Sequence, residues 1–233
     1  MSQFVVHLTR NDTKDFSNGA TAKENLISIL KSRKIFAVRP HCIFNTEIKA
    51  LGKTAVAKCR AACFTETPLS EIGKLARKIE GRAIELESYG LVFRKEDLIK
   101  AGGQPAIYIN SYDRNNWLRE SIRELFESAK ANESSKLWRL IPYLNAMHEK
   151  YDFSWEREWR MHTDFKFKLT DIVCIILPEN GENEIKDKAA KAGIAVISPS
   201  WTYEHIVYQL SSQQRKTKTI TIDGELKSGK SEK

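Results

Sequence analysis

The sequence predicts a single mixed α/β domain, and three observations support this fold class. Short apolar runs typical of strands alternate with longer segments in which apolar residues follow helical spacing. No segment of the 233 residues is repeated, and no Pro-, Gly- or Ser-rich linker divides them. We therefore expect residues 1–212 to form one domain, and the Lys-, Ser-, Thr- and Gly-rich residues 213–233 to form a basic, flexible tail.

The first two elements are a strand and a helix. Residues 4–9 have the apolar, β-branched composition of a strand. After a polar loop, residues 22–32 are predicted to be helical, because Leu26, Ile29 and Leu30 fall on one face at helical spacing.

Prolines punctuate the next elements. The strand predicted over 35–38 ends before Pro40, because the residue preceding a proline disfavours helix. A second short strand is predicted over 61–65. Pro68 suits the first turn of a helix, which we expect to extend over 69–79.

The middle of the chain is predicted to alternate between strand and helix. Residues 89–93 form a strand, 95–101 a short helix closed by two glycines, and 105–109 another strand. The segment 116–151 is expected to be mainly helical, with a break near Pro142.

The C-terminal part returns to strands. Residues 155–161 alternate with period two, so they are predicted to form a strand. A strand over 172–177, a helix over 183–192 and a strand over 194–197 then predict a βαβ-like close to the domain.

Composition limits the compartment and the partners. No run approaches the roughly 18 apolar residues that a membrane span requires, and the first residues lack a basic export signal. We therefore expect a cytoplasmic protein without a membrane partner. The net charge of +8 suits a polyanionic partner such as nucleic acid or a dinucleotide, although the tail and solvated helix faces carry much of it.

The four cysteines are expected to be structural. Cys174 lies in an apolar run and is predicted to be a small buried hydrophobic residue. Cys42, Cys59 and Cys63 could form a zinc site with His41, but no second closely spaced pair completes the pattern. No metal site is therefore expected.

Six segments taken in order resemble the AbiGi-like abortive-infection family of phage-resistance proteins. They contain a His-x-Thr start, an Asn-Leu-x-x-x-Leu helix, Cys-Phe-x-x-x-Pro-Leu, Tyr-Gly before a strand, Pro-x-x-Tyr-Ile and Glu-x-Glu-Trp-Arg. Their positions are 6–9, 25–30, 63–69, 89–95, 102–109 and 155–160. The resemblance extends over residues 4–200 and implies a role in phage defence, with a partner protein of the defence system.

The same segments resemble, more distantly, the DarT-type ADP-ribosyltransferases. This resemblance implies a split sheet with flanking helices and NAD as the substrate. It also implies that His7 and Thr9 of the first strand contact the ribose and diphosphate, and that Glu158 or Glu156 is the catalytic carboxylate. Such enzymes stack an aromatic residue on nicotinamide. No tyrosine occurs between His7 and Tyr89, so a phenylalanine would take that place, the candidates being Phe36, Phe44 and Phe64.

Cleavage of the bond between nicotinamide and ribose requires a carboxylate. The reaction passes through an oxocarbenium-like state, which negative charge stabilises. On a strand, Glu156 and Glu158 would point to the same side, so one can orient the substrate while the other acts on the ribose. Thr65 and Glu66 could also lie beside the ligand, which would make Glu66 a third catalytic candidate.

Basic residues are candidates for contacts with phosphate. Arg10 is predicted to belong to the cofactor-binding set with His7, Thr9, Phe64 and Thr65. Two other candidates for a phosphate contact are Arg39 and Lys95.

Each candidate also has a structural explanation. His7 could form a hydrogen bond at the edge of the core, and Glu66 could compensate the dipole of a helix that follows it. Glu156 and Glu158 could belong to a surface ion-pair ladder with Arg157 and Arg160.

Three function hypotheses follow. The first is a defence effector that transfers ADP-ribose from NAD to a nucleic-acid or protein acceptor, or hydrolyses NAD. The second is a non-enzymatic antitoxin or nucleic-acid-binding module. The third is a nuclease in which Glu66, Glu156 and Glu158 hold a metal ion; it ranks last because the usual Asp/Glu-x-Lys signature is absent.

Overall fold

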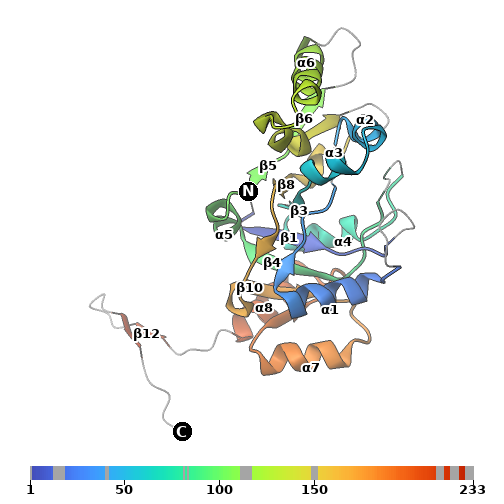
Figure 1. The fold of residues 1–233 in the computed structure, drawn as a ribbon. Coiled ribbons are helices and arrows are strands. Elements are labelled where there is room, and N and C mark those ends of the chain that lie inside the picture. Colours follow the sequence, from blue (N-terminus) through green and yellow to red (C-terminus); the bar gives the residue numbers. More distant parts are fainter. Residues whose placement is uncertain are drawn as a thin grey trace.

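A continuous seven-stranded sheet forms the centre of the computed structural model (Figure 1). Its strands, in spatial order, are β11 (Ala195–Ile197), β10 (Ile172–Ile176), β4 (Gly90–Arg94), β1 (Phe4–Leu8), β3 (Ala62–Thr65), β8 (Glu158–Met161) and β5 (Gln104–Pro105). Neighbours are antiparallel except β10 and β11, which are parallel. The structure describes residues 2–12, 19–39, 42–80, 82, 84–110, 117–147, 152–213, 218–220 and 226–228.

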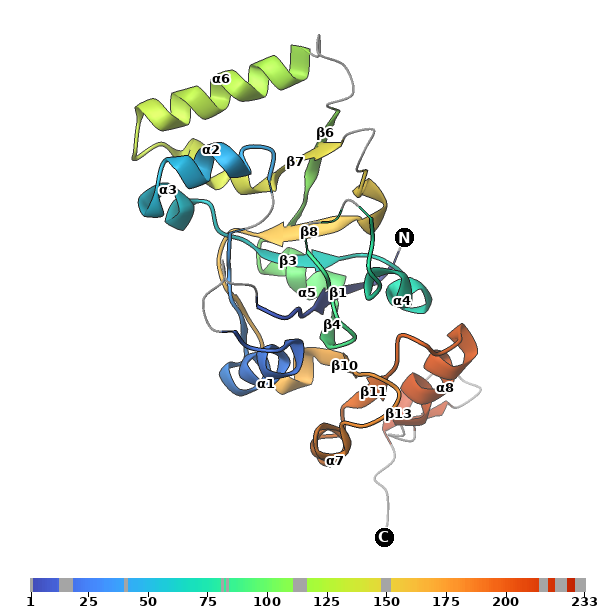
Figure 2. The ribbon, with the colours of Figure 1, turned by 90° about the vertical axis from the view of Figure 1, so that its right-hand side faces the viewer.

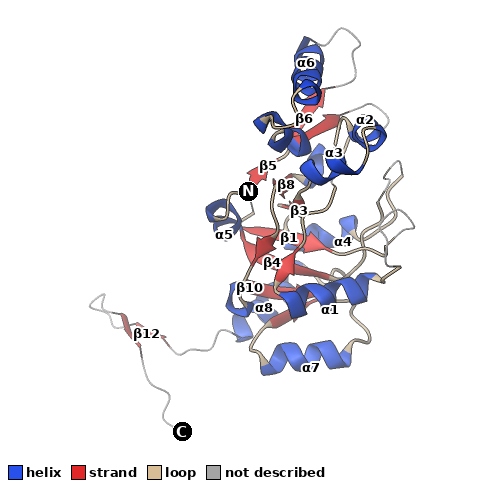
Figure 3. Ribbon diagram, in the orientation of Figure 1, coloured by secondary structure: helices blue, strands red, loops and turns tan. Residues whose placement is uncertain are grey.

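Helices cover both faces of this sheet. Helices α1 (Ala22–Ser32) and α7 (Asn183–Lys191) pack on one face, called here the α1 face, against Val5, Phe64 and Phe93. Helices α4 (Ile72–Leu75) and α8 (Tyr203–Gln213) pack on the other, called the α8 face, against Val6, Val92 and Cys174. Figure 3 shows this layering of helices over strands. The predicted mixed α/β class is confirmed.

A lobe with its own apolar core adjoins the β8 end of the sheet (Figure 2). Phe44 and Phe126 stack at its centre, with ring centroids 4.2 Å apart. Its elements are α2 (Asn45–Ala50), α3 (Lys53–Lys58), α6 (Trp117–Ala131) and the parallel pair β6 (Ile107–Asn110) and β7 (Leu144–Met147). The resemblance implied a split sheet; the seven main strands are instead continuous, and β6–β7 is a separate pair.

Many predicted elements are confirmed within a residue or two. Helix α1 has the predicted bounds, and its N-cap Thr21 forms a capping box with Glu24. The predicted strand–helix–strand close is β10–α7–β11, whose two strands pair in parallel. Helix α5 (Lys95–Lys100) also lies where the sequence predicts it.

Five predicted elements are wrong in extent. The strand expected over 35–38 is formed only at residues 34–35, and the strand expected over 105–109 is divided between β5, at the edge of the main sheet, and β6, in the lobe. The helix expected over 69–79 is a 3₁₀ turn followed by α4, which ends at Leu75; Gly73 weakens it and also lies close to the Pro199 carbonyl. Within 117–147, the described part of the segment 116–151, α-helix is confined to α6, and after a turn at 132–135 the chain continues as 3₁₀ turns and β7. The strand expected over 155–161 begins only at Glu158.

The sequence pattern did not reveal the helices α2, α3 and α8. The described residues also form two further strand pairs: β2 (Lys34–Ile35) with β9 (Phe165–Lys166), and β12 (Lys218–Ile220) with β13 (Leu226–Ser228). Within 213–233 the structure describes only the end of α8 and the β12–β13 pair, so the flexibility expected of this tail stays a prediction. No helix in the described ranges combines the length and the apolarity needed to cross a membrane.

Gly90 offers a test of the sheet. It pairs with Leu8 and Ile176 on either side, and an added Cβ would lie 2.5 Å from the His7 carbonyl oxygen. Because that neighbour is backbone, Gly90→Ala must push β4 away from β1, and we expect a loss of about 1–3 kcal/mol in the free energy of unfolding. Urea denaturation measures this loss of stability. Arg94→Ala, at an exposed position of the same strand, should change stability far less; equal losses in the two variants would contradict this packing.

Candidate active site

The register of β3 with β8 divides the candidate residues between the two faces of the sheet. Thr65 pairs with Glu158, and Cys63 pairs with Arg160. Directly opposed residues of an antiparallel pair point to the same side. Since Val6 pairs with Thr65 and belongs to the core of the α8 face, Glu158 lies on that face as well.

Glu156 reaches the same region from a turn rather than from the strand. Residues Ser154–Glu156 form a 3₁₀ turn, and Arg157 then adopts a left-handed conformation (φ 50°, ψ 54°) before β8 begins. The two carboxyl groups do lie in the same region, but the predicted reason, that both residues belong to one strand, is wrong. Trp155, expected to be in the core, is 43% exposed.

Hydrogen bonds from the end of β3 hold this turn. The backbone carbonyl of Glu156 accepts from the hydroxyl of Thr65, and from that of Thr67 at 3.4 Å. The carbonyl of Arg157 accepts from the backbone N–H of Glu66 at 3.1 Å. The Thr65-Glu66-Thr67 segment therefore fixes the path of the chain between the two carboxylates.

The carboxyl group of Glu156 is buried and only partly paired. Its side chain is 14% exposed, and Oε2 accepts from Nη2 of Arg82 at 3.3 Å. Oε1 is buried and has no hydrogen-bond partner among the described residues. Burial raises the pKa of Glu156 to about 7; Arg82 opposes this rise, and the negative charge of Glu158 adds to it. This carboxyl group can therefore gain and lose a proton near neutral pH.

Glu158 is held by a buried cation. Its Oε2 accepts from Nη2 of Arg160 at 2.6 Å, and Arg160 is 1% exposed. Nη1 of Arg160 donates to the carbonyl of Pro142, which belongs to the lobe. Tyr108, on strand β6 of the lobe, lies near enough to Glu158 for this charge to add to the effect of burial in raising the pKa of the phenol.

Glu66 lies apart from the other two glutamates. Its carboxylate accepts from Nε1 of Trp159 at 3.0 Å, and Trp159 packs on the α1 face. It also pairs with Lys95 at 3.1 Å and with Arg157 at 2.7 Å. Burial opposes the charge of Glu66, but the hydrogen bonds from Trp159 and Lys95 outweigh it and lower the pKa. Lys95, a candidate for phosphate contact, is thus an ion-pair partner.

The three glutamates therefore do not converge on one point. Glu156 and Glu158 interact on the α8 face, whereas Glu66 contacts side chains of the α1 face. In the described part of the chain, no cluster of three or more His, Cys, Asp or Glu residues is placed to hold a metal ion. The metal-nuclease hypothesis thus lacks the convergence of carboxylates on which it depended.

His7 and Thr9 bind backbone groups. The ring of His7 tilts against Phe64 on the α1 face, and its Nδ1 donates to the carbonyl of Cys63 at 2.8 Å. Burial lowers the pKa of His7, so the neutral ring is favoured. Thr9 is buried and donates through Oγ1 to the carbonyls of Ala22 and Tyr89. Both side chains join the first strand to its surroundings.

The other residues predicted to contact NAD also lie in different places. Phe64 is 3% exposed and packs edge-on against Phe93 and Phe165, so its ring belongs to the core. Arg10 is partly buried, and burial lowers its pKa. Among the predicted cofactor-binding residues, Thr65 binds beside the carboxylate pair, through its hydrogen bond to the carbonyl of Glu156.

The cysteines lie in three different parts of the structure. Cys174 lies buried in β10, as predicted. Cys42 and Cys59 are buried in the lobe core, while Cys63 is on β3 next to Glu158. His41, the proposed fourth zinc ligand, lies outside the described residues.

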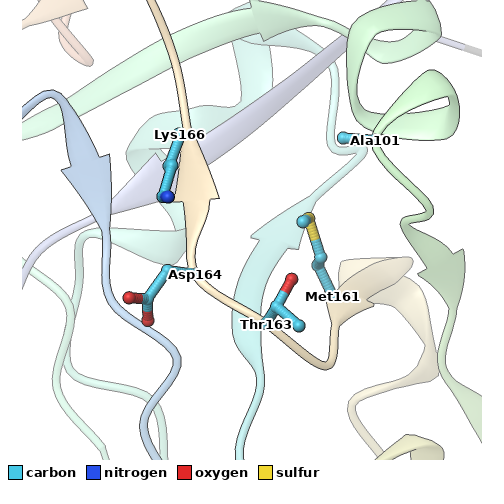
Figure 4. A pocket seen from close by; sticks show the side chains of 5 residues that line it. All are labelled: Ala101, Met161, Thr163, Asp164 and Lys166. Carbon is cyan, nitrogen blue, oxygen red and sulfur yellow. The ribbon is translucent and has the colours of Figure 1, made fainter.

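Two surface hollows lie away from the carboxylates. One, of about 530 Å³, is lined by Ala101, Met161, Thr163, Asp164 and Lys166 (Figure 4). The other, of about 260 Å³, lies between α7 and α8, where Trp201 and Ile197 contribute to its apolar lining.

Sequence reasoning missed Arg160, the buried partner of Glu158, and four further residues of the site. Arg82, Thr67, Arg157 and Tyr108 all contact or electrostatically influence the carboxylates or their turn. Arg82 lies in an irregular segment with no recognisable motif, so no sequence signal marked it. Arg157 lies inside the Glu-x-Glu motif, but no feature of the sequence marks the left-handed conformation of its backbone.

Comparisons with known proteins give no match: no protein-family model matches the sequence, and no curated protein or solved structure is significantly similar to it.

The buried acid predicts a pH-dependent stability. The folded protein holds the Glu156 proton more tightly than the unfolded chain, because the pKa rises from 4.5 to about 7 on folding. This stabilisation is complete below about pH 4.5 and is lost as the pH rises through 7, and it amounts to about 3 kcal/mol. Glu156→Gln removes the titration, so the variant should be more stable than the wild type at pH 8 and similar at pH 5.

Urea denaturation at pH 5 and pH 8 measures this difference. Glu85→Gln, at an exposed position, is the matched control and should follow the wild type. If Glu156→Gln keeps the wild-type pH dependence, the buried carboxyl group does not have the raised pKa.

Proposed function

We propose that this chain is a cytoplasmic phage-defence enzyme that breaks the nicotinamide–ribose bond of NAD and passes the ADP-ribosyl group to a macromolecule or to water. The observation that carries the proposal is the pair Glu156 and Glu158. One carboxyl group titrates near neutrality, and the other is ion-paired with Arg160. Most glycoside hydrolases divide the reaction between two carboxyl groups that lie in different environments.

The two carboxyl groups suit different steps. Glu158, fixed by Arg160, would orient the ribose hydroxyls and stabilise positive charge that develops on the ribose. The glycosidic C–N bond breaks, and its electron pair leaves with the nicotinamide nitrogen, which becomes neutral. Glu156 would take the proton from the attacking hydroxyl as the new bond to ribose forms.

The substrate is expected on the α8 face, near the turn at Glu156. Arg157, whose side chain is 37% exposed, would supply a cation for the diphosphate beside this turn, whereas Arg82 is paired with Glu156. The contacts first predicted for His7, Thr9 and Phe64 do not support a pocket on the opposite face, because backbone bonds and core packing already engage these side chains. The resemblance of six segments to abortive-infection proteins supports the assignment to phage defence.

Nicotinamide release from NAD tests the reaction. The wild type should release it with cell lysate, DNA or RNA offered as acceptor, and Glu158→Gln and Glu156→Gln should each lower the rate at least a hundredfold. The control Glu204→Gln, exposed on α8, should be unaffected. His7→Ala should have a smaller effect than either site variant. No release from folded wild-type protein with any acceptor would favour a non-enzymatic antitoxin or binding module.

The pH dependence of the rate tests the role of Glu156. A general base must be ionised, so kcat/KM should rise as the pH increases through about 7 and then level off. In Glu156→Gln the residual rate should lack this rise. A rate that falls over the same range would show that the protonated form is required, which would assign Glu156 as an acid.

A further inference from the structure

The β2–β9 pair presents a cationic surface on its outer side. Ile35, Phe165 and Phe167 are buried in the core of the α1 face. Lys34 and Lys166 are directly opposed in the antiparallel register, so their side chains share the other, outward side. A strand pair of this kind places its charges at fixed positions.

An exposed aromatic ring lies within this surface. Phe36 is 45% exposed, although a phenylalanine ring is ordinarily buried. Nζ of Lys34 lies 4.3 Å from the centre of the ring, so a cation covers part of it. Val38, two residues further along, is also exposed at 44%.

The positive charge of the surface is only partly neutralised. Asp164 pairs with Lys34 at 3.2 Å and accepts from the backbone N–H of Ala37 at 2.8 Å. Burial opposes the charge of Asp164, but the hydrogen bonds from Ala37 and Lys34 lower its pKa, and the exposed Arg60 lies close enough to add to this lowering. In the described ranges, neither Arg60 nor Lys166 forms an ion pair within 4.0 Å.

A hollow adjoins these cations. Asp164 and Lys166 line it from one strand segment, and Met161, Thr163 and Ala101 complete it (Figure 4). Its volume of about 530 Å³ is large enough to admit a nucleotide-sized group. Met161 is three residues from Glu158 along β8, which corresponds to about 10 Å.

We propose that this surface binds single-stranded nucleic acid, with a base stacked on Phe36 and backbone phosphates at Arg60 and Lys166. Single strands are bound by aromatic stacking combined with cations that follow the backbone, and every base offers a face for stacking. In a duplex the bases are already stacked on each other, so the ring would have nothing to bind. The surface lies outside the proposed active site and does not depend on NAD chemistry.

Fluorescence anisotropy of a labelled 15-nucleotide oligo-dT and oligo-U, at several salt concentrations, tests the proposal without any enzymatic readout. Phe36→Ala should weaken binding at least fivefold, because a stacked base is lost. Arg60→Ala/Lys166→Ala should weaken binding and also lower the slope of log K against log salt by about 1.4, since two phosphate contacts are lost.

The control Lys78→Ala/Lys191→Ala removes the same charge at other exposed positions and should keep the wild-type slope. Circular dichroism checks that each variant is folded. Equal weakening by the control and surface pairs, or duplex bound as tightly as single strand, would overturn the proposal. The proposal would also be overturned if the protein bound anionic lipid vesicles through Phe36 and Arg60 but did not bind the oligonucleotides.

Discussion

The buried guanidinium of Arg160 is the charge on which the candidate site depends. A cation that is 1% exposed is tolerated only when it is paired and hydrogen-bonded. Glu158 supplies the paired charge from the same strand, and the carbonyl of Pro142 supplies a second acceptor from the lobe. One side chain therefore sets the direction of a carboxylate and also joins the lobe to β8. Loss of this cation would leave Glu158 without its partner and the lobe without this contact.

The second constraint is the turn at Arg157. A left-handed conformation costs a residue with a Cβ about 1–2 kcal/mol, and other contacts must offset it. Glu66 supplies these contacts twice, through its backbone N–H to the carbonyl of Arg157 and through its carboxylate to the guanidinium. The geometry thus gives Glu66 a role in positioning Glu156 and Glu158, while the catalytic role first predicted for it stays a prediction.

Local sequence patterns predicted individual helices and strands, but they did not predict the arrangement of the site. Helix α1 and the β10–α7–β11 unit follow from spacing, capping and apolar runs. The turn before β8 does not, because Glu66, which holds Arg157, is 91 residues away in sequence. The face to which His7 points likewise depends on pairings with β3 and β4, which composition does not determine. Trp155 matched the period-two pattern and is nevertheless exposed.

The energetics of Glu156 connect the fold with the proposed reaction. At neutral pH a glutamine at this position would avoid the cost of a buried charge and would retain similar shape. The glutamate is therefore a stability disadvantage, with one oxygen buried and unbonded among the described residues. Such a group is well suited to exchange a proton with a bound molecule, since a ligand hydroxyl would supply the missing hydrogen bond. The same burial that destabilises the ionised carboxyl group brings its pKa to about 7, where a general base is most effective.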